Sequence, residues 1–460
     1  MEQKHWNRRE LLKSLGLAAA AVPFTAGVAN GRTPANEIEP ILFSKERKPG
    51  KPLTAIVIGA GSRGWGAYSS YGLKFPDELQ VVGVAEPIPY RRERMAQAFN
   101  IPEKHQFVTW EHVFELPKFA DALIITTPDD LHYGPAMAGL EQGYDMILEK
   151  VIAQTWKECN DILQLAEKHE AIVAVCHVLR YNPYFRKMKE FIETAAIGEV
   201  VSVQHLEPVE RIHMSHSFVR GNWGNSKKSN PMILSKSCHD TDILRWLIDK
   251  PCKKVSSFGS LSLFREEMAP AGSTNRCTGG CTIERDCPYS AIKLYLEQRG
   301  WLQHLNLEEV NDDTILRELK NGPYGRCVYH CDNDVVDHQV SNFEFEGGIT
   351  AAFSMEALTH YGGRRTRIFG TEGDIFGDET TLTLTNVDGK QEVWDAKKTL
   401  KGASGHGGGD HGLVHDFVRA VDAQDPSLLT STIQVSMESH LMGFQAEASR
   451  LADGVVKKIV

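Results

Sequence analysis

The chain has 460 residues, a net charge of −9 and an ordinary globular composition, with 42% hydrophobic and 24% charged residues. This length is more than one hydrophobic core usually organises, so we expect two domains. The negative charge, without a dense stripe of Lys and Arg, argues against a nucleic-acid partner, and beyond the N-terminus no apolar run has the length of a membrane span.

Residues 1–30 have the pattern of an export signal. Arg8 and Arg9 precede an apolar run over residues 15–24, and small residues follow. This order predicts a signal of the twin-arginine type and an exported, periplasmic protein. An ordinary amphipathic helix is the alternative. Residues 31–50, rich in Pro, Glu and Lys, are expected to form a linker.

The stretch "LTAIVIGAGSRG" joins a short apolar strand to a glycine motif. Gly59 suits a tight turn, Gly61 lets a pyrophosphate approach the backbone, and Gly64 allows close packing of helix on strand. The loop residues Ser62 and Arg63 are predicted to contact the same cofactor. The motif predicts a dinucleotide-binding strand, turn and helix at the start of a domain over residues 51–178.

A second apolar strand, "LQVVGVAEP", ends in Glu86. A carboxylate at this place accepts hydrogen bonds from the adenosine ribose and repels a 2′-phosphate, which favours NAD over NADP. Arg91 and Arg92 follow and could bind a phosphate instead, so NADP stays open. A surface carboxylate at a strand end is the other interpretation of Glu86.

Three more apolar runs, "ADALIITTPDDLH", "YDMILEK" and "AIVAVCHVLRY", are separated by helix-length segments. Such runs predict parallel strands covered on both faces, and therefore an α/β domain with a Rossmann-type sheet. Ligands of such sheets bind beyond the carboxyl ends of the strands. The polar residues expected there include Thr127, Pro128, Glu149, Lys150, Arg180 and Tyr181.

The stretch "MILSKSCHDTDILRWL" places Lys236, His239 and Asp240 at the start of a helix with a core stripe. Lys236 and His239 share a helix face at i, i+3 spacing. These residues either form part of a site or satisfy free backbone N–H groups at the helix start. Lys236 is either a catalytic cation or an ion-pair partner.

The second domain, residues 179–460, is expected to bind substrate, with Arg180, Tyr181 and Asp240 among the contacts. "EVVSVQHLEPVERIHMSHSFVRGNWGN" mixes aromatic and hydrogen-bonding groups, among them His213, Arg220 and Trp223, which suit a sugar; a solvated loop is the alternative. "VSNFEFEGGITAAFSMEAL" alternates apolar and polar residues as antiparallel strands do.

The chain has nine cysteines, and Cys277, Cys281 and Cys287 lie close together in "RCTGGCTIERDC". Thiolates at short loop spacing suggest a structural metal such as zinc, or an iron–sulfur centre. The spacing differs from the common C-x2-C pattern, and in an exported protein disulfides are an equal alternative. Free thiols are the third.

The runs "VIGAGSRG", "VAEP", "TTPDDLH", "LEKV", "HVLRYNP" and "KSCHDTD" together resemble the Gfo/Idh/MocA family, well over residues 53–247 and more loosely beyond. The resemblance implies an N-terminal Rossmann domain and a C-terminal α/β domain with a large, open, mostly antiparallel sheet. C-terminal helices would pack back on the first domain. Most members oxidise or reduce sugars and cyclitols with NAD(P), and some are NAD-dependent glycosidases.

The resemblance also assigns roles by position. Thr127, Pro128 and His132 would contact the cofactor, as would Glu149 and Lys150, which match the start of the Glu-Lys-Pro motif whose lysine reaches the reacting hydroxyl. His239 would be the acid/base. Two departures concern orientation: Val151 stands in place of the proline, and Ser235 in place of an aspartate four residues before the histidine.

We therefore expect an NAD-dependent oxidoreductase that acts on a hydroxyl of a sugar, cyclitol or glycoside. An NAD-dependent glycosidase is the alternative, and an inactive sugar-binding protein is a further one. The catalytic residues would be Lys150, His239 and Lys236. A homo-oligomer is expected, because the open sheet of this family often pairs between subunits.

Overall fold

The computed structural model describes residues 50–305, 307–399 and 405–459. The predicted export signal, and all of the predicted linker except residue 50, lie outside these residues. Among the described helices, none is long and apolar enough to cross a membrane.

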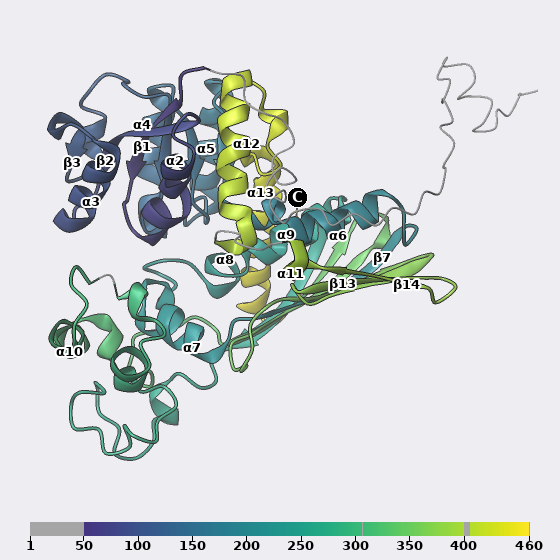
Figure 1. The fold of residues 1–460 in the computed structure, drawn as a ribbon. Helices are drawn as coiled ribbons and strands as arrows, with labels where there is room; N and C mark the ends of the chain where they lie inside the picture. The colour runs from purple at the N-terminus through teal and green to yellow at the C-terminus, as the bar shows by residue number, and fades with distance from the viewer. Residues whose placement is uncertain (1–49, 306, 400–404, 460) are drawn as a thin grey trace, which may run out of the picture. The chain divides into compact units, whose positions relative to one another are not determined.

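The first domain is built on a parallel sheet with strand order β3-β2-β1-β4-β5-β6 (Figure 1). Alternate residues of β1 face two different cores: Val57 packs in one and Ile56 in the other, so the strand is covered on both sides. The strands are β1 (Leu53–Ile58), β2 (Leu79–Ala85), β3 (Gln106–Phe107), β4 (Ala122–Ile125), β5 (Asp145–Leu148) and β6 (Val173–Val175). The α-helices between them are α2 (Ser70–Lys74), α3 (Pro89–Phe99), α4 (Tyr133–Glu141) and α5 (Trp156–Lys168).

The second domain is built on a mixed sheet with strand order β14-β13-β12-β11-β7-β10-β9-β8-β15. β7 and β10 pair in parallel, and the other neighbours are antiparallel. The strands are β7 (Val200–Pro208), β8 (Cys252–Ser260), β9 (His338–Phe345), β10 (Thr350–Glu356), β11 (Arg365–Gly370), β12 (Gly373–Gly377), β13 (Thr381–Asn386), β14 (Gln391–Asp395) and β15 (Lys457–Lys458). Together the two sheets confirm the predicted fold class.

Short helices precede and follow β7 along the chain. They are α6 (Pro183–Glu193), α7 (Arg211–His213), α8 (Met232–Ser235) and α9 (Cys238–Ile248), with a π-helix over Met214–Arg220. Asn182 caps α6 by accepting the N–H of Tyr184. α9 is the core-striped helix of the sequence, and it begins one residue before His239.

The long connection between β8 and β9 has a small core of its own. Helix α10 (Asp312–Asn321) contributes Ile315 and Leu319, which pack with Tyr295. This connection carries the clustered cysteines. The connection also packs on the sheet, because Phe264, Tyr289 and Val328 belong to the main core of the second domain.

The C-terminal helices pack on the first domain. Helix α12 (Gly409–Ala423) places Leu413 and Phe417 in the same core as Val57 of β1. Helix α13 (Ile433–Arg450) places Ile433 in the core on the other face of the sheet and also contacts α9 and β8. A short helix, α11 (Ala396–Thr399), follows β14. Because α12 returns to β1, residues near its start reach the glycine loop.

Candidate active site

The glycine loop has room at one of its three glycines. A Cβ on Gly59, whose φ is +94°, would lie 2.7 Å from the Thr126 carbonyl oxygen, and one on Gly64 would lie 2.0 Å from the Gly59 oxygen. A Cβ on Gly61 would meet nothing nearer than the Arg91 guanidinium, 3.9 Å away. Gly59 and Gly64 thus close the turn, and the open space at Gly61 fits the approach of a dinucleotide pyrophosphate.

Glu86 is fixed at the mouth of this loop. Its two carboxylate oxygens accept the backbone N–H groups of Ala60 at 2.7 Å and Ile88 at 3.0 Å, and the residue is buried. Each oxygen keeps further acceptor capacity, so the position fits the ribose-binding role. The Arg92 side chain donates to the Glu86 carbonyl.

Arg63, predicted to contact the cofactor, forms the centre of an ion-pair network. Its guanidinium pairs with Glu149 at the end of β5, contacts the Tyr68 hydroxyl, and pairs with Asp410 of α12 at 3.0 Å. Burial alone would raise the pKa of Glu149, but the charges of Arg63 and Lys150 outweigh it and hold that pKa below its ordinary value. Arg63 and Glu149 therefore join the glycine loop to β5 and α12. Ser62 begins the helix of the loop.

Lys150 projects from the carboxyl end of β5 toward the second domain. Its Nζ donates to the backbone carbonyl of Ser235, and it lies 5.6 Å from the centre of the Trp223 ring. The Lys150–Val151 peptide is cis. Ser235 stands where the family pattern has an aspartate. In this chain, the backbone carbonyl of that residue, rather than a carboxylate, holds the lysine.

His239 lies at the start of α9 with its side chain almost entirely buried. The residue is 7% exposed, and Nδ1 has no hydrogen-bond partner. Its ring centre is 6.2 Å from that of His177 and 5.7 Å from that of His406. Burial, then the charge of Lys150, holds the pKa of His239 well below its ordinary value. The imidazole is therefore neutral at physiological pH and is a proton acceptor.

The segment after β4 contacts the second domain through a residue that the sequence analysis did not single out. Asp129, which is buried, accepts the indole N–H of Trp223 at 3.0 Å and the Ser229 hydroxyl at 2.9 Å. The predicted residue His132 lies between the carbonyl groups of Val151 and Thr127. Thr127 and Pro128 flank the start of this short turn. In the sequence, the acidic pair after the strand in "TTPDDLH" is the feature that could have pointed to Asp129.

Lys236 and Asp240 belong to a second buried charge network, on the face of the large sheet. The Lys236 Nζ pairs with Glu207 at 3.1 Å, and Glu207 pairs with Arg364 at 2.9 Å. Arg364 in turn pairs with Asp240 at 2.6 Å. Asp240 is fully buried and also contacts His205, so the role it shows is structural, and its binding of substrate stays a prediction. Of the two interpretations of Lys236, the structure shows the ion pair.

We expect Lys236→Met to have a mild effect on turnover. The substitution keeps most of the side-chain length and removes a charge whose visible partner is Glu207, which still has Arg364. The expected change in kcat/KM is less than about tenfold, equivalent to about 1.4 kcal/mol. Steady-state kinetics would check it. A fall of several hundredfold with normal folding would instead place Lys236 among the groups that act on the reacting oxygen.

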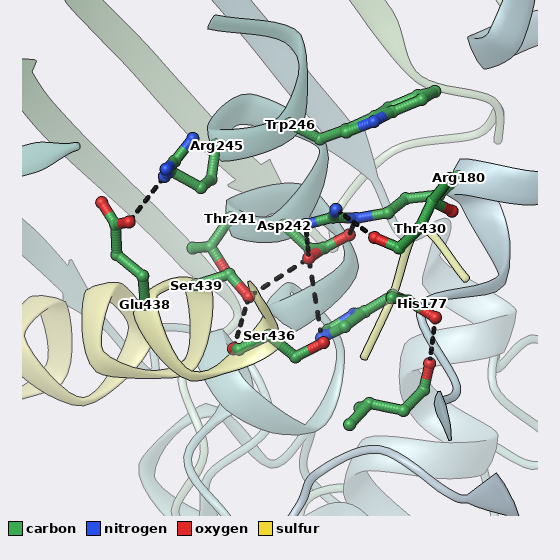
Figure 2. A network of polar contacts seen from close by, with 12 residues as sticks. His177, Arg180, Thr241, Asp242, Arg245, Trp246, Thr430, Ser436, Glu438 and Ser439 are labelled. Carbon is green, nitrogen blue, oxygen red and sulfur yellow. Dashed lines mark hydrogen bonds and ion pairs between the residues drawn. The ribbon is translucent and has the colours of Figure 1, made fainter. Parts of the chain in front are cut away.

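Arg180 and Tyr181, which are predicted to bind substrate, are interior residues with protein partners. Figure 2 shows Asp242 of α9 between Arg180 and His177. Arg180 donates twice to Asp242, both times at 2.7 Å, and once to the Thr430 carbonyl at 2.6 Å, and it is 4% exposed. Tyr181 bonds to the Ser431 hydroxyl within the core of the first domain. Polar groups after a strand pointed to a ligand, but their partners come from α9 and from the approach to α13.

We expect Arg180→Met to destabilise the protein. Removing the cation leaves the buried Asp242 carboxylate without its bidentate partner, and breaking such a pair typically costs about 3–5 kcal/mol. Urea denaturation would measure it. Lys157→Met is the matched control, because it removes an exposed ion pair on α5 and should leave the unfolding midpoint unchanged. Equal midpoints for the two variants would contradict the expectation.

Of the remaining residues predicted to bind substrate, Arg220 has structural partners and Trp223 lies at the site. Arg220 is buried and donates to the carbonyls of Arg326 at 2.7 Å and Tyr289 at 2.6 Å, so it holds the cysteine-bearing connection. Trp223 lies beside Lys150, as described above. Burial, with the charge of Lys236, lowers the pKa of His213 to about 2, and this ring packs 5.3 Å from that of Trp301.

The predicted metal centre is not supported. All nine cysteines are free thiols in the structure, and among the described residues no group of three or more His, Cys, Asp or Glu side chains is placed to hold a metal ion. The Cys277 sulfur instead accepts the backbone N–H of Ala291 at 3.4 Å and faces the Arg220 guanidinium. The disulfides that were the alternative are not formed either.

Two family profiles match most of the chain. The "Oxidoreductase family, NAD-binding Rossmann fold" matches residues 53–177, and the "GFO/IDH/MocA C-terminal domain" matches residues 185–376.

Among curated proteins, YteT of Bacillus subtilis (strain 168) is 24% identical over 372 residues, which cover 76% of this chain and 84% of that protein. The scyllo-inositol 2-dehydrogenase (NAD(+)) of the same strain is 26% identical over 215 residues, 45% of this chain and 58% of that enzyme. Among solved structures, levoglucosan dehydrogenase with NADH and L-sorbose has a TM-score of 0.65 at 16% identity, covering 89% of this chain and 100% of the other. At that identity the likeness shows the fold.

Proposed function

We propose that this chain, which belongs to the Gfo/Idh/MocA family of oxidoreductases, is an NAD-dependent dehydrogenase of a sugar, cyclitol or glycoside hydroxyl. The observation that carries the proposal is a fixed lysine near a buried, neutral histidine beyond the carboxyl ends of the parallel strands. Lys150 follows β5, and its charge is the strongest of those that depress the pKa of His239. A fixed cation beside a proton acceptor is what oxidation of a hydroxyl requires.

The residues of the first domain fit NAD. The pyrophosphate would lie at Gly61, where the backbone is open, and the ribose at Glu86. When bound, NAD supplies the acceptor for a hydride from the carbon that bears the hydroxyl, or the donor in the reverse direction.

The protein's own part in the reaction is proton transfer and charge stabilisation. His239 takes the hydroxyl proton as the carbon is oxidised, which its neutral imidazole permits. Lys150 donates to the same oxygen and stabilises the negative charge that develops on it. The Trp223 ring beside Lys150 offers an apolar face to a ring-shaped polyol.

The substrate class rests on relatives. One curated relative is named a scyllo-inositol dehydrogenase, and one solved structure with this fold is a levoglucosan dehydrogenase. Purified protein should be denatured and its released nucleotide identified by mass spectrometry. Cyclitols, sugars and aryl glycosides should then be tested for NADH absorbance and for aglycone release. Formation of NADH supports the dehydrogenase. Aglycone release without added NAD would indicate the glycosidase, and binding without either product an inactive sugar-binding protein.

We also propose that the protein is exported through a twin-arginine signal. Changing Arg8 and Arg9 to lysine should leave soluble protein in the cytoplasm, because the paired arginines are the feature that such signals present. Cell fractionation followed by immunoblotting would measure it. Export of the double variant at the parent level would contradict the proposal.

The proposed homo-oligomer has support in the second sheet. Phe258 and Val340 lie opposite each other on β8 and β9, and they are 57% and 41% exposed. An apolar pair on an uncovered sheet face favours contact with a second copy.

A further inference from the structure

A proton accepted by His239 has to leave a buried position before the next turnover. The residue His239 is 7% exposed and its pKa is far below the ordinary value, so the imidazolium form is not stable there. The charged groups that face it are Lys150 after β5, Arg364 before β11, and the rings of His177 and His406. The two cations disfavour the proton and cannot accept it.

Only one of the neighbouring histidines of His239 that the structure describes leads to solvent. His177 is fully buried, and the ring next to it, His440, is fully buried as well. The His406 side chain is 38% exposed, and its ring centre is 5.7 Å from that of His239. Among the described histidines beside His239, His406 is therefore the one that reaches the surface.

The two ring nitrogens of His406 have different hydrogen-bonding roles. Nδ1 lies 3.0 Å from a carboxylate oxygen of Asp410, the second residue of α12. Because that oxygen accepts, Nδ1 carries the proton and Nε2 is left as an acceptor. Asp410 is buried and stays ionised, since its partner Arg63 lowers its pKa against the effect of burial.

The backbone around His406 is held in place. Its carbonyl accepts the side-chain N–H of Asn182 at 2.9 Å. A Cβ at Gly407, whose φ is +64°, would lie 2.6 Å from the same Asn182 side chain, and one at Gly409 would lie 2.2 Å from the Val178 oxygen. The loop thus fits against the residues that follow β6, and it presents His406 to His239 at a defined position.

We propose that His406, oriented by Asp410, relays the proton between His239 and solvent. This rests on the proposed dehydrogenase function. As the carbon is oxidised, its C–H electron pair leaves as hydride to NAD⁺ and its hydroxyl proton goes to His239. His239 then passes a proton to Nε2 of His406, and His406 releases one to water or buffer. His406 acts through His239 and is not itself in contact with the reacting atoms.

The test uses His406→Ala on full-length holoenzyme, with whichever of myo-inositol, scyllo-inositol and levoglucosan the parent oxidises. Stopped-flow absorbance would follow NADH in the first turnover, and a pH-indicator dye would follow proton release. We expect first-turnover hydride transfer within about twofold of the parent, delayed proton release, and a steady-state rate at least about tenfold lower. Added imidazole should restore the steady-state rate. His411→Ala is the control, since that ring contacts Ser70 and lies on α12 next to Asp410, and its rate should be unchanged and insensitive to imidazole.

Two results would overturn the relay. One is parent-like steady-state turnover in His406→Ala with no dependence on buffer. The other is equal loss of hydride transfer and steady-state rate that imidazole does not restore, which would show a structural role. Histidine ¹⁵N NMR gives a readout independent of turnover: we expect the Nδ1–H tautomer for His406, and the Nε2–H tautomer would also overturn the relay. If the parent itself oxidises no polyol, the proposed function has failed rather than the relay, and the NMR result still decides the tautomer.

Discussion

His239→Asn should lower hydride transfer by about 10²–10⁴-fold, the usual cost of losing a general acid/base. Asparagine keeps a polar side chain of similar reach at the start of α9 but does not exchange a proton in the working pH range. Nδ1 of His239 has no protein partner, so the substitution breaks no hydrogen bond of that nitrogen. Folding and NAD content should therefore stay near the parent values while the rate falls. Single-turnover formation of NADH, with nucleotide content measured on the same preparation, would check both.

The pH dependence of hydride transfer in the parent provides a second test of His239. Its pKa is depressed by burial and by Lys150, so the base form persists as the pH falls through the ordinary histidine range near 6.5. Hydride transfer should therefore stay level across that range and decline only at more acidic pH. A parent-like rate for His239→Asn would identify His239 as a buried structural histidine. A decline centred near pH 6.5 in the parent would contradict its assignment as the base.

The local parts of the site could be predicted from sequence because their chemistry lies in consecutive residues. Gly59, Gly61 and Gly64 lie in one turn, and their spacing alone requires a close backbone approach. Lys150 and His239 each stand in a short motif after a recognisable strand or at a helix start. The parallel sheet of the first domain could be predicted from apolar runs of strand length, because strands that are covered on both faces are apolar at nearly every position.

The partners of these residues could not be predicted, because they come from distant parts of the chain. Asp410 meets Arg63 across 347 positions, and Asp242 meets Arg180 across 62. A polar side chain after a strand suggests a ligand until its partner is known, which is why Arg180 and Asp240 were assigned to substrate. In the same way, the spacing of Cys277, Cys281 and Cys287 does not reveal that a backbone N–H already satisfies the first thiol.

Gly61→Val should remove the cofactor while leaving the protein folded. An ideal Cβ at this position meets no atom within 3.9 Å, so the fold has room for the side chain. That room is where the pyrophosphate approaches the backbone. Forcing extra methyl groups into a filled space typically costs about 1–3 kcal/mol, so NAD should bind at least about 10- to 100-fold more weakly. Released nucleotide per protein chain and the Kd for NADH by fluorescence titration would measure the loss.

Two further variants separate loss of binding from loss of structure. Gly66→Val adds the same side chain to the same helix at a position where a Cβ likewise meets nothing, so it should keep both fold and cofactor. Gly64→Val drives a Cβ to within 2.0 Å of the Gly59 oxygen and should lower the melting temperature as well as NAD content. We expect Gly61→Val to keep the melting temperature of the parent, as Gly66→Val does. We expect it to lose NAD, as Gly64→Val does. If instead it keeps its nucleotide through purification, the pyrophosphate does not lie at this turn, because the side chain would occupy the space assigned to it.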